Sequence, residues 1–145
     1  MAAATANIDI NASVQCTFAG DLATFTGTPK ITSSTNLSSS DISKVFQDIR
    51  AASAADPLDL TSGLVDPYGN ALVFTAVKLV CIKNTSATAT LTVGGGSNPV
   101  FGSDQYTIKA GVCLPILSSF TVDGTHKILT ITPSAAATYQ IIIAG

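Results

Sequence analysis

The sequence predicts an all-β fold, a jelly-roll-like antiparallel β-sandwich formed by one domain over residues 1–145. β-Branched Thr, Val and Ile are frequent, and such side chains fit a pleated, half-buried surface. About eight to ten short strand-like segments are separated by turn residues roughly every 8 to 12 positions, which is typical of a sandwich or barrel. Helix-forming charged residues are scarce, since all nine acids are Asp and only one Arg occurs. The alternating βαβ pattern of a parallel sheet is missing.

The N-terminal part of the chain has a weaker strand pattern than the rest. Residues 7–25 alternate loosely and break at Gly20-Asp21, which predicts strands joined by a turn. Residues 27–40 are loop-like, because they hold a Ser/Thr/Asn cluster, with one short strand around Ile31. Residues 1–40 are therefore expected to be either an ordered part of the domain or a partly extended arm.

One short helix is predicted over residues 41–52, covering a sheet or an open end of the fold. Four apolar residues spaced i, i+3, i+4 and i+7 would share one face of this helix: Ile42, Val45, Phe46 and Ile49. Ser40 is suited to cap its start, and Arg50 suits the last turn because its charge complements the helix dipole. Asp56-Pro57 marks a boundary that the helix should not cross.

Strand patterns are densest in the second half of the chain. Strands are predicted over residues 72–83, 88–93, 105–109, 112–117, 120–122, 127–131 and 138–143. Asp123-Gly124 stands between two of these segments, which predicts a hairpin. Residues 56–70 form a long connection rich in turn residues.

Charge and hydropathy exclude two classes of partner. The net charge is −2 and is spread along the chain, so no basic patch is available for nucleic acid. No apolar run approaches the roughly 20 residues of a membrane-spanning helix. Residues 1–13 lack the positive and apolar regions of a signal peptide. We therefore expect no nucleic acid and no membrane as partners.

The chain has three cysteines, Cys16, Cys81 and Cys113, which are far apart in the sequence. Their odd number and wide spacing fit neither a secreted disulfide framework nor a paired metal site. Each lies in an apolar or strand-like stretch. We expect each to be a small buried hydrophobe in a reducing cytoplasm.

No catalytic, cofactor-binding or metal-binding residue is predicted, and the chain is expected not to be an enzyme. His126, the only histidine, follows a turn, and no G-x-S-x-G motif occurs. The run Gly94 to Gly96 lacks the Gly-Lys-Ser/Thr of a phosphate loop and opens no predicted helix. Asp56, Asp59 and Asp66 lack the spacing of a calcium loop.

Residues 76–145 resemble small structural proteins of tailed-bacteriophage virions. The resemblance covers about half of the chain and follows an apolar strand ending in Lys-Asn-Thr, a threonine-rich strand ending in Gly, a Lys-Ala-Gly turn and a final isoleucine strand. The residues that carry it are Val77-Lys78-Leu79-Val80-Cys81-Ile82-Lys83-Asn84-Thr85-Ser86, Ala89-Thr90-Leu91-Thr92-Val93-Gly94, Ile108-Lys109-Ala110-Gly111-Val112 and Tyr139-Gln140-Ile141-Ile142-Ile143-Ala144-Gly145.

The resemblance implies a capsid decoration or cement protein. In such proteins a jelly roll or related sandwich sits on the phage head, often as a homotrimer that clamps neighbouring coat subunits. The expected partners are then the major capsid protein and copies of the chain itself, and the expected location is the virion, assembled in the host cytoplasm. Binding would be spread over strand edges, loops and apolar patches.

Two other functions stay open at this level. The chain fits a tail or fibre component that attaches to a host surface, which would be present in few copies per particle. It also fits a small carbohydrate-binding or hydrolytic module, because the separation of paired carboxylates is set by the fold. Against the latter, aromatic platforms for sugars are few, with no Trp and only Tyr68, Tyr106 and Tyr139.

Overall fold

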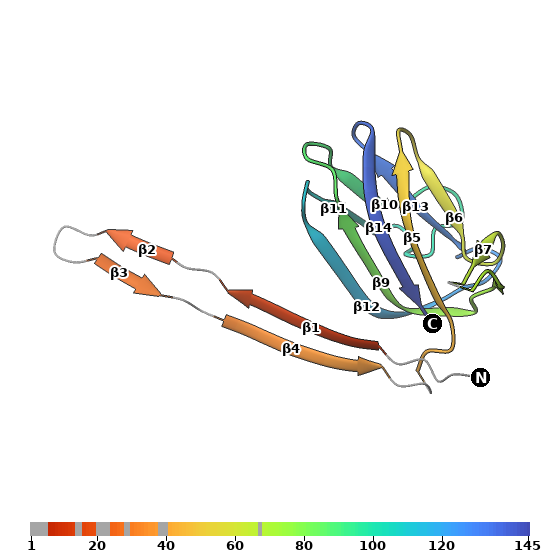
Figure 1. Cartoon of the computed structure of the whole chain (residues 1–145), viewed down its shortest axis with the longest axis horizontal. Coiled ribbons are helices and arrows are strands. Elements are labelled where there is room, and N and C mark those ends of the chain that lie inside the picture. Colours follow the sequence, from red (N-terminus) through yellow and green to blue (C-terminus); the bar gives the residue numbers. More distant parts are fainter. Residues whose placement is uncertain (1–5, 14–15, 20–23, 28–29, 38–40, 67) are drawn as a thin grey trace.

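The protein is all-β. The computed structural model describes residues 6–13, 16–19, 24–27, 30–37, 41–66 and 68–145, and of the strands before residue 41 it describes the backbone alone. Figure 1 shows a two-sheet body and, apart from its sheets, two successive two-stranded ladders. The strands are β1 Ala6–Ser13, β2 Cys16–Ala19, β3 Thr24–Gly27, β4 Lys30–Leu37, β5 Val45–Ala52, β6 Asp56–Asp59, β7 Leu64–Val65, β8 Ala71–Leu72, β9 Ala76–Asn84, β10 Leu91–Gly94, β11 Gln105–Ile108, β12 Cys113–Thr121, β13 Ile128–Pro133 and β14 Ala137–Ala144.

Two four-stranded antiparallel sheets make up the body. Sheet I has the strand order β12-β9-β14-β5, and sheet II has the order β11-β10-β13-β6. The antiparallel strand pairs are nested: β10 pairs with β11, β9 with β12, β6 with β13 and β5 with β14. The chain from β5 to β14 is therefore one long hairpin whose closed end is the β10–β11 connection. Additional pairs, β9 with β14 and β10 with β13, roll this hairpin into two sheets.

The core lies between the two sheets. Along β14, residues alternate between buried and exposed, with Tyr139, Ile141 and Ile143 at most 1% exposed. They share one hydrophobic cluster with Leu129 and Ile131 of β13 in the other sheet. Period-two alternation of this kind is what a strand with one face on a core requires.

The predicted helix over residues 41–52 is wrong, because residues 45–52 form the strand β5 and residues 41–44 are not helical. All eight residues of β5 pair with β14, from Val45 opposite Ala144 to Ala52 opposite Ala137. The helix face would have buried Ile49, which is instead 72% exposed, while Phe46 is buried. A helix of this length is marginal without tertiary packing, so the long ladder with β14 outweighs the local spacing.

The predicted hairpin at Asp123-Gly124 is also wrong. The strands before and after it, β12 and β13, belong to different sheets. The carboxylate of Asp123 accepts hydrogen bonds from the backbone N–H groups of Thr125 and His126, so the dipeptide does form a turn. Local turn chemistry reverses the chain but does not decide which strands pair.

The N-terminal ladders agree in part with the sequence. Strands are expected over residues 7–25, where β1 and β2 and the first half of β3 lie, whereas the expected turn at Gly20-Asp21 lies outside the described residues. β4 is longer than the short strand expected around Ile31 and pairs with β1 over eight residues. The Ser and Thr residues of this segment predict a loop, but Thr also suits a strand because it is β-branched.

Candidate functional site

The best-connected polar cluster joins Arg50, Asp56 and Tyr139. The carboxylate of Asp56 accepts hydrogen bonds from Arg50 Nε at 2.7 Å, from Arg50 Nη2 at 2.8 Å and from Tyr139 Oη at 2.6 Å. The hydrogen bond from Arg50 holds the pKa of Asp56 below its usual value, and burial raises the pKa of Tyr139. A carboxylate with a lowered pKa and both oxygens engaged is a poor general base, so we assign this cluster to stability.

Asp59, Asp66 and Asp123 each close a turn of their own chain segment. Asp59 accepts from the Thr61 hydroxyl at 2.6 Å, and Asp66 accepts from the Asn70 side chain at 2.9 Å. These hydrogen bonds lower the pKa of both carboxyl groups, and the backbone N–H of Thr125 lowers that of Asp123 to about 2. Within the described ranges, no three His, Cys or Asp side chains gather closely enough to hold a metal ion.

His126 lies at an exposed turn beside Asp123 and Thr125. Its Nδ1 is 3.0 Å from the Thr125 hydroxyl and 3.2 Å from Asp123 Oδ1. A hydrolytic triad needs the base to contact the nucleophile through one ring nitrogen and the orienting carboxylate through the other. Here a single nitrogen faces both groups, so the arrangement is that of a turn.

The glycine run at the end of β10 has a conformational role. Gly94 has a φ of 103°, and a Cβ added there would lie 2.4 Å from the carbonyl oxygen of Asp104. The run leads into the long connection to β11, and no helix follows it to direct backbone amides at a phosphate.

We expect the substitution Gly94→Ala to lower the free energy of unfolding by about 2 kcal/mol, because it combines a positive φ with a backbone clash. Gly63→Ala is the matched control, since Gly63 also has a positive φ, 75°, but nothing lies within 4 Å of the added Cβ. Gly63→Ala should lower the free energy of unfolding by about 1 kcal/mol. Urea unfolding of both variants measures the difference, and equal losses would show that the clash is relieved at no cost.

The cysteines of the body differ from the prediction that each is buried. Cys81 is half-buried, Cys113 is exposed, and their Sγ atoms are 3.4 Å apart on neighbouring strands of sheet I. Burial and the neighbouring thiol raise the pKa of Cys81 to about 11, so this thiol stays protonated at neutral pH. The side chain of Cys16 lies outside the described residues.

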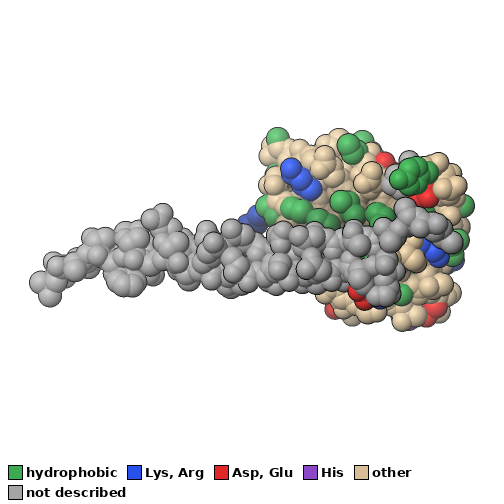
Figure 2. Space-filling model, turned by 60° about the horizontal axis from the view of Figure 1, so that its bottom comes forward, with side chains coloured by type: hydrophobic (Ala, Val, Ile, Leu, Met, Phe, Trp, Pro, Cys, Tyr) green, Lys and Arg blue, Asp and Glu red, His purple; other side chains and the backbone are tan. Residues whose placement is uncertain are grey.

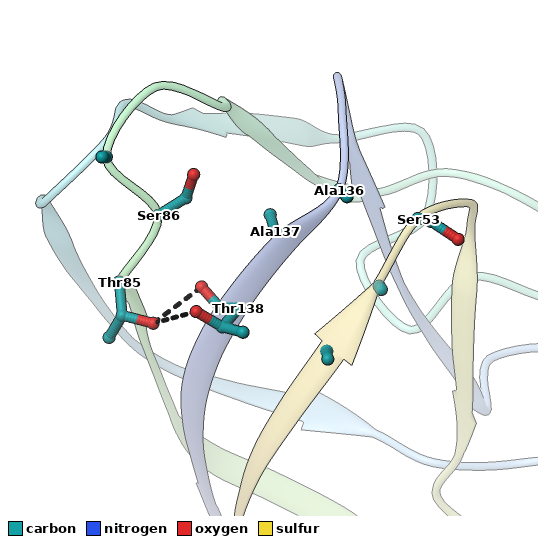
Figure 3. Close-up of a pocket in the computed structure, with 9 residues that line it drawn as sticks. Ser53, Thr85, Ser86, Ala136, Ala137 and Thr138 are labelled. Carbon is teal, nitrogen blue, oxygen red and sulfur yellow. Dashed lines mark hydrogen bonds between the residues drawn. The ribbon is translucent and has the colours of Figure 1, made fainter.

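One hollow of the body lies where β5 and β9 end and β14 begins, and it has no charged, histidine or cysteine side chain in its lining. It measures about 490 Å³ and is lined by small neutral residues, namely Ala51, Ala52, Ser53, Thr85, Ser86, Ala87, Ala136, Ala137 and Thr138. Figure 3 shows Thr85 and Thr138 joined across one wall, where the Thr85 hydroxyl lies 2.8 Å from both the carbonyl and the hydroxyl oxygen of Thr138. Small-molecule sites usually combine aromatic walls with convergent polar groups, and this lining has hydroxyl groups but no aromatic side chain.

The outer side of sheet I is the most distinctive surface among the described residues. The register places fourteen residues on it, which we call the neutral face: Val45, Gln47, Ile49 and Ala51 of β5, Thr138, Gln140, Ile142 and Ala144 of β14, Leu79, Cys81 and Lys83 of β9, and Cys113, Pro115 and Leu117 of β12. Lys83 is the only charged residue in this set. Polar and charged residues usually dominate the solvent side of an antiparallel sheet.

Large apolar side chains are exposed on the neutral face. Ile49 is 72% exposed and Ile142 is 41% exposed, and a hollow of about 400 Å³ lies between their strands. At one end the buried Ile42 packs on Leu79 and Ala144. In the view of Figure 2, hydrophobic side chains lie among other uncharged side chains and backbone over the visible described surface, and charged side chains are scattered. Exposed large apolar side chains on a nearly uncharged sheet face are a common feature of protein interaction surfaces.

Comparison of the chain with protein-family models, with curated proteins and with solved structures found no match. Among the residues that the structure describes, none forms a helix with the length and hydropathy that a membrane crossing requires.

Sequence reasoning missed both notable groups. In the Arg50–Asp56–Tyr139 cluster, Asp56 and Tyr139 are 83 positions apart, so no local sequence pattern predicts the cluster. The neutral face had a weak signature, because Gln140 and Ile142 alternate with the buried residues of β14 and carry no charge.

Proposed function

We propose that this chain is a structural virion protein, a capsid decoration or cement subunit that stabilises a phage head by binding across neighbouring coat subunits. The neutral face is the observation that carries the proposal, since an exposed, nearly uncharged sheet surface suits packing within an assembly, against a coat subunit or a further copy of the chain. The resemblance of residues 76–145 to virion structural proteins supports the same role. Fold alone does not establish function, so the proposal needs its own test.

We infer further that the body is a jelly-roll β-sandwich. The nested pairing of β5 to β14 supports this assignment, because a jelly roll is a long hairpin rolled into two facing sheets. Six of its seven connections would cross between the sheets, with the β10–β11 hairpin as the exception. Jelly rolls recur in viral capsid domains and also in lectins and cupins, so this fold is compatible with the role and does not define it.

The partners that we propose are the major capsid protein and further copies of the chain, assembled as a homotrimer. Nucleic acid and membrane are not proposed as partners, and the proposed location is the virion, assembled in the host cytoplasm. A net charge of −2 over 145 residues gives little repulsion between copies, which permits close subunit packing. Symmetric repetition of weak contacts over a head would add avidity.

Copy number in purified virions tests the proposal. Quantitative mass spectrometry against the major capsid protein should find the chain in many, stoichiometric copies. Heads that lack it should lose their DNA at lower temperature than complete heads, with the same phage complemented by the intact gene as control. A few copies per particle would replace the proposal by a tail or fibre role, and absence from particles would end it.

A further inference from the structure

The β1–β4 ladder has two faces of opposite chemistry. Its eight-residue antiparallel register runs from Ala6 opposite Leu37 to Ser13 opposite Lys30. Because successive strand residues belong to opposite faces, one face collects the positions of Ala6, Ile8, Ile10, Ala12, Ile31, Ser33, Thr35 and Leu37. The other collects only polar residue types, at the positions of Asn7, Asp9, Asn11, Ser13, Lys30, Thr32, Ser34 and Asn36. We call the first set the apolar ladder face.

A ladder of two strands has no second layer that could cover such a face. The ladder belongs to neither four-stranded sheet, and an isolated two-stranded ladder is marginally stable in water. In Figure 1 the β1–β4 and β2–β3 ladders follow one another and extend well past the body. An apolar face of this kind is stabilised by a covering surface, and neither strand of the ladder pairs with a strand of the body.

The neutral face matches the apolar ladder face in size and chemistry. The ladder strands β1 and β4 have eight residues, as do β5 and β14 of sheet I, so both surfaces are about 26 Å long at the usual rise per residue. Apart from Lys83 on the neutral face, both consist of apolar or neutral residue types, which two sheets that pack face to face need on their inner surfaces.

We propose that the apolar ladder face of one copy packs on the neutral face of a second copy, so that the N-terminal ladders are exchanged between neighbours. This inference deepens the proposed function and rests on it, because it names the contact through which building blocks join. A neighbour is the occupant that we propose because β1 and β4 pair with no strand of the body and the two ladders run on past the body in Figure 1. Exchange of this kind closes into a ring when the rotation between copies allows it, which a homotrimer would satisfy.

Matched charge substitutions in the purified full chain test the proposal. Ile8→Asp with Ile10→Asp places two charges on the apolar ladder face, and Asn7→Asp with Asn11→Asp places the same two on its polar face. Ile142→Asp alters the neutral face, and Val73→Asp is its control, since Val73 is 48% exposed and lies outside both sheets. Circular dichroism and thermal unfolding should confirm that all four variants are folded.

Two readouts separate the outcomes. Light scattering at micromolar concentration should show oligomers for the parent and both controls, and monomers for both test variants. In a Cys16→Ser background, alkylation of Cys113, which is exposed on the neutral face, should be about tenfold slower in the oligomer than in the test variants. A monomeric parent overturns the proposal at any alkylation rate of Cys113. Slow alkylation in a monomer would mean that the chain's own ladder covers the neutral face. An oligomer insensitive to both test variants overturns it as well.

These measurements use purified protein and no phage, so the ladder exchange can be contradicted without contradicting the proposed function. A chain that is abundant in virions but monomeric when pure would remove the ladder exchange alone. A chain that is absent from virions but oligomeric through these faces would remove the decoration role alone.

Discussion

Replacing Asp56 by alanine is expected to lower the free energy of unfolding by about 3 kcal/mol, within the range for breaking a largely buried ion pair. The carboxylate accepts three hydrogen bonds of 2.6 to 2.8 Å, two from Arg50 and one from Tyr139. Tyr139 is 0% exposed, so its hydroxyl would keep no partner for its proton. The side chain of Arg50 is 30% exposed, and water would solvate part of its charge, which holds the loss below the upper end of that range.

Asp48→Ala is the matched control, because Asp48 also pairs with Arg50, at 3.1 Å, but its side chain is 41% exposed. An exposed pair contributes little, and the control should cost about 0.5 kcal/mol or less. Urea unfolding at neutral pH gives both values. Similar losses for the two variants would mean that Arg50, and not Asp56, organises the cluster.

The pH dependence gives a second measurement on the same variant. The folded-state pKa of Asp56 is lowered, so its contribution is present above the unfolded-state pKa of about 3.9 and is lost as the pH falls through the folded-state value. The stability difference between the parent and Asp56→Ala should therefore be constant near neutral pH and shrink under acid. A difference that persists at acid pH would point to lost packing instead of lost charge.

The strands of the second half were predictable because their information is local. Strands were expected over residues 72–83, 105–109, 127–131 and 138–143, and β9, β11, β13 and β14 lie there. Each has the buried run or the alternation that a half-buried strand needs. The all-β class followed from these segments and from the scarcity of helix-forming charged residues.

Pairing partners were not predictable, because they depend on residues far apart in the sequence. β5 had a helical spacing of apolar residues, yet its partner β14 lies some ninety positions later and decides its conformation. The neutral face exists only after β5, β9, β12 and β14 have been placed side by side. A single strand sequence cannot show whether its outer residues meet neutral or charged neighbours.

Asn84 provides the larger of the two expected effects, about 4 kcal/mol for Asn84→Ala. Its side chain is fully buried, and its Nδ2 donates to the carbonyl oxygens of Ala89 at 2.8 Å and Ile108 at 3.2 Å. Its Oδ1 accepts from the backbone N–H of Ser86 at 3.0 Å. Alanine would leave three backbone groups without these hydrogen bonds, at about 1 to 3 kcal/mol for each that stays dry, and would open a cavity as well.

The position of Asn84 explains why so much depends on one amide. It ends β9 of sheet I, whereas Ile108 ends β11 of sheet II, so the side chain ties the two sheets together where no strand pairing does. Asn70→Ala is the control. The Asn70 side-chain amide also donates a hydrogen bond, to Asp66 at 2.9 Å, but it lies at an exposed turn. This substitution should lower the free energy of unfolding by about 1 kcal/mol. Asn84→Asp should lower the free energy of unfolding by as much as Asn84→Ala, because a carboxylate cannot donate hydrogen bonds to two carbonyl oxygens. Urea unfolding ranks the three variants, and a stable Asn84→Asp would show that water or a neighbouring donor replaces the amide.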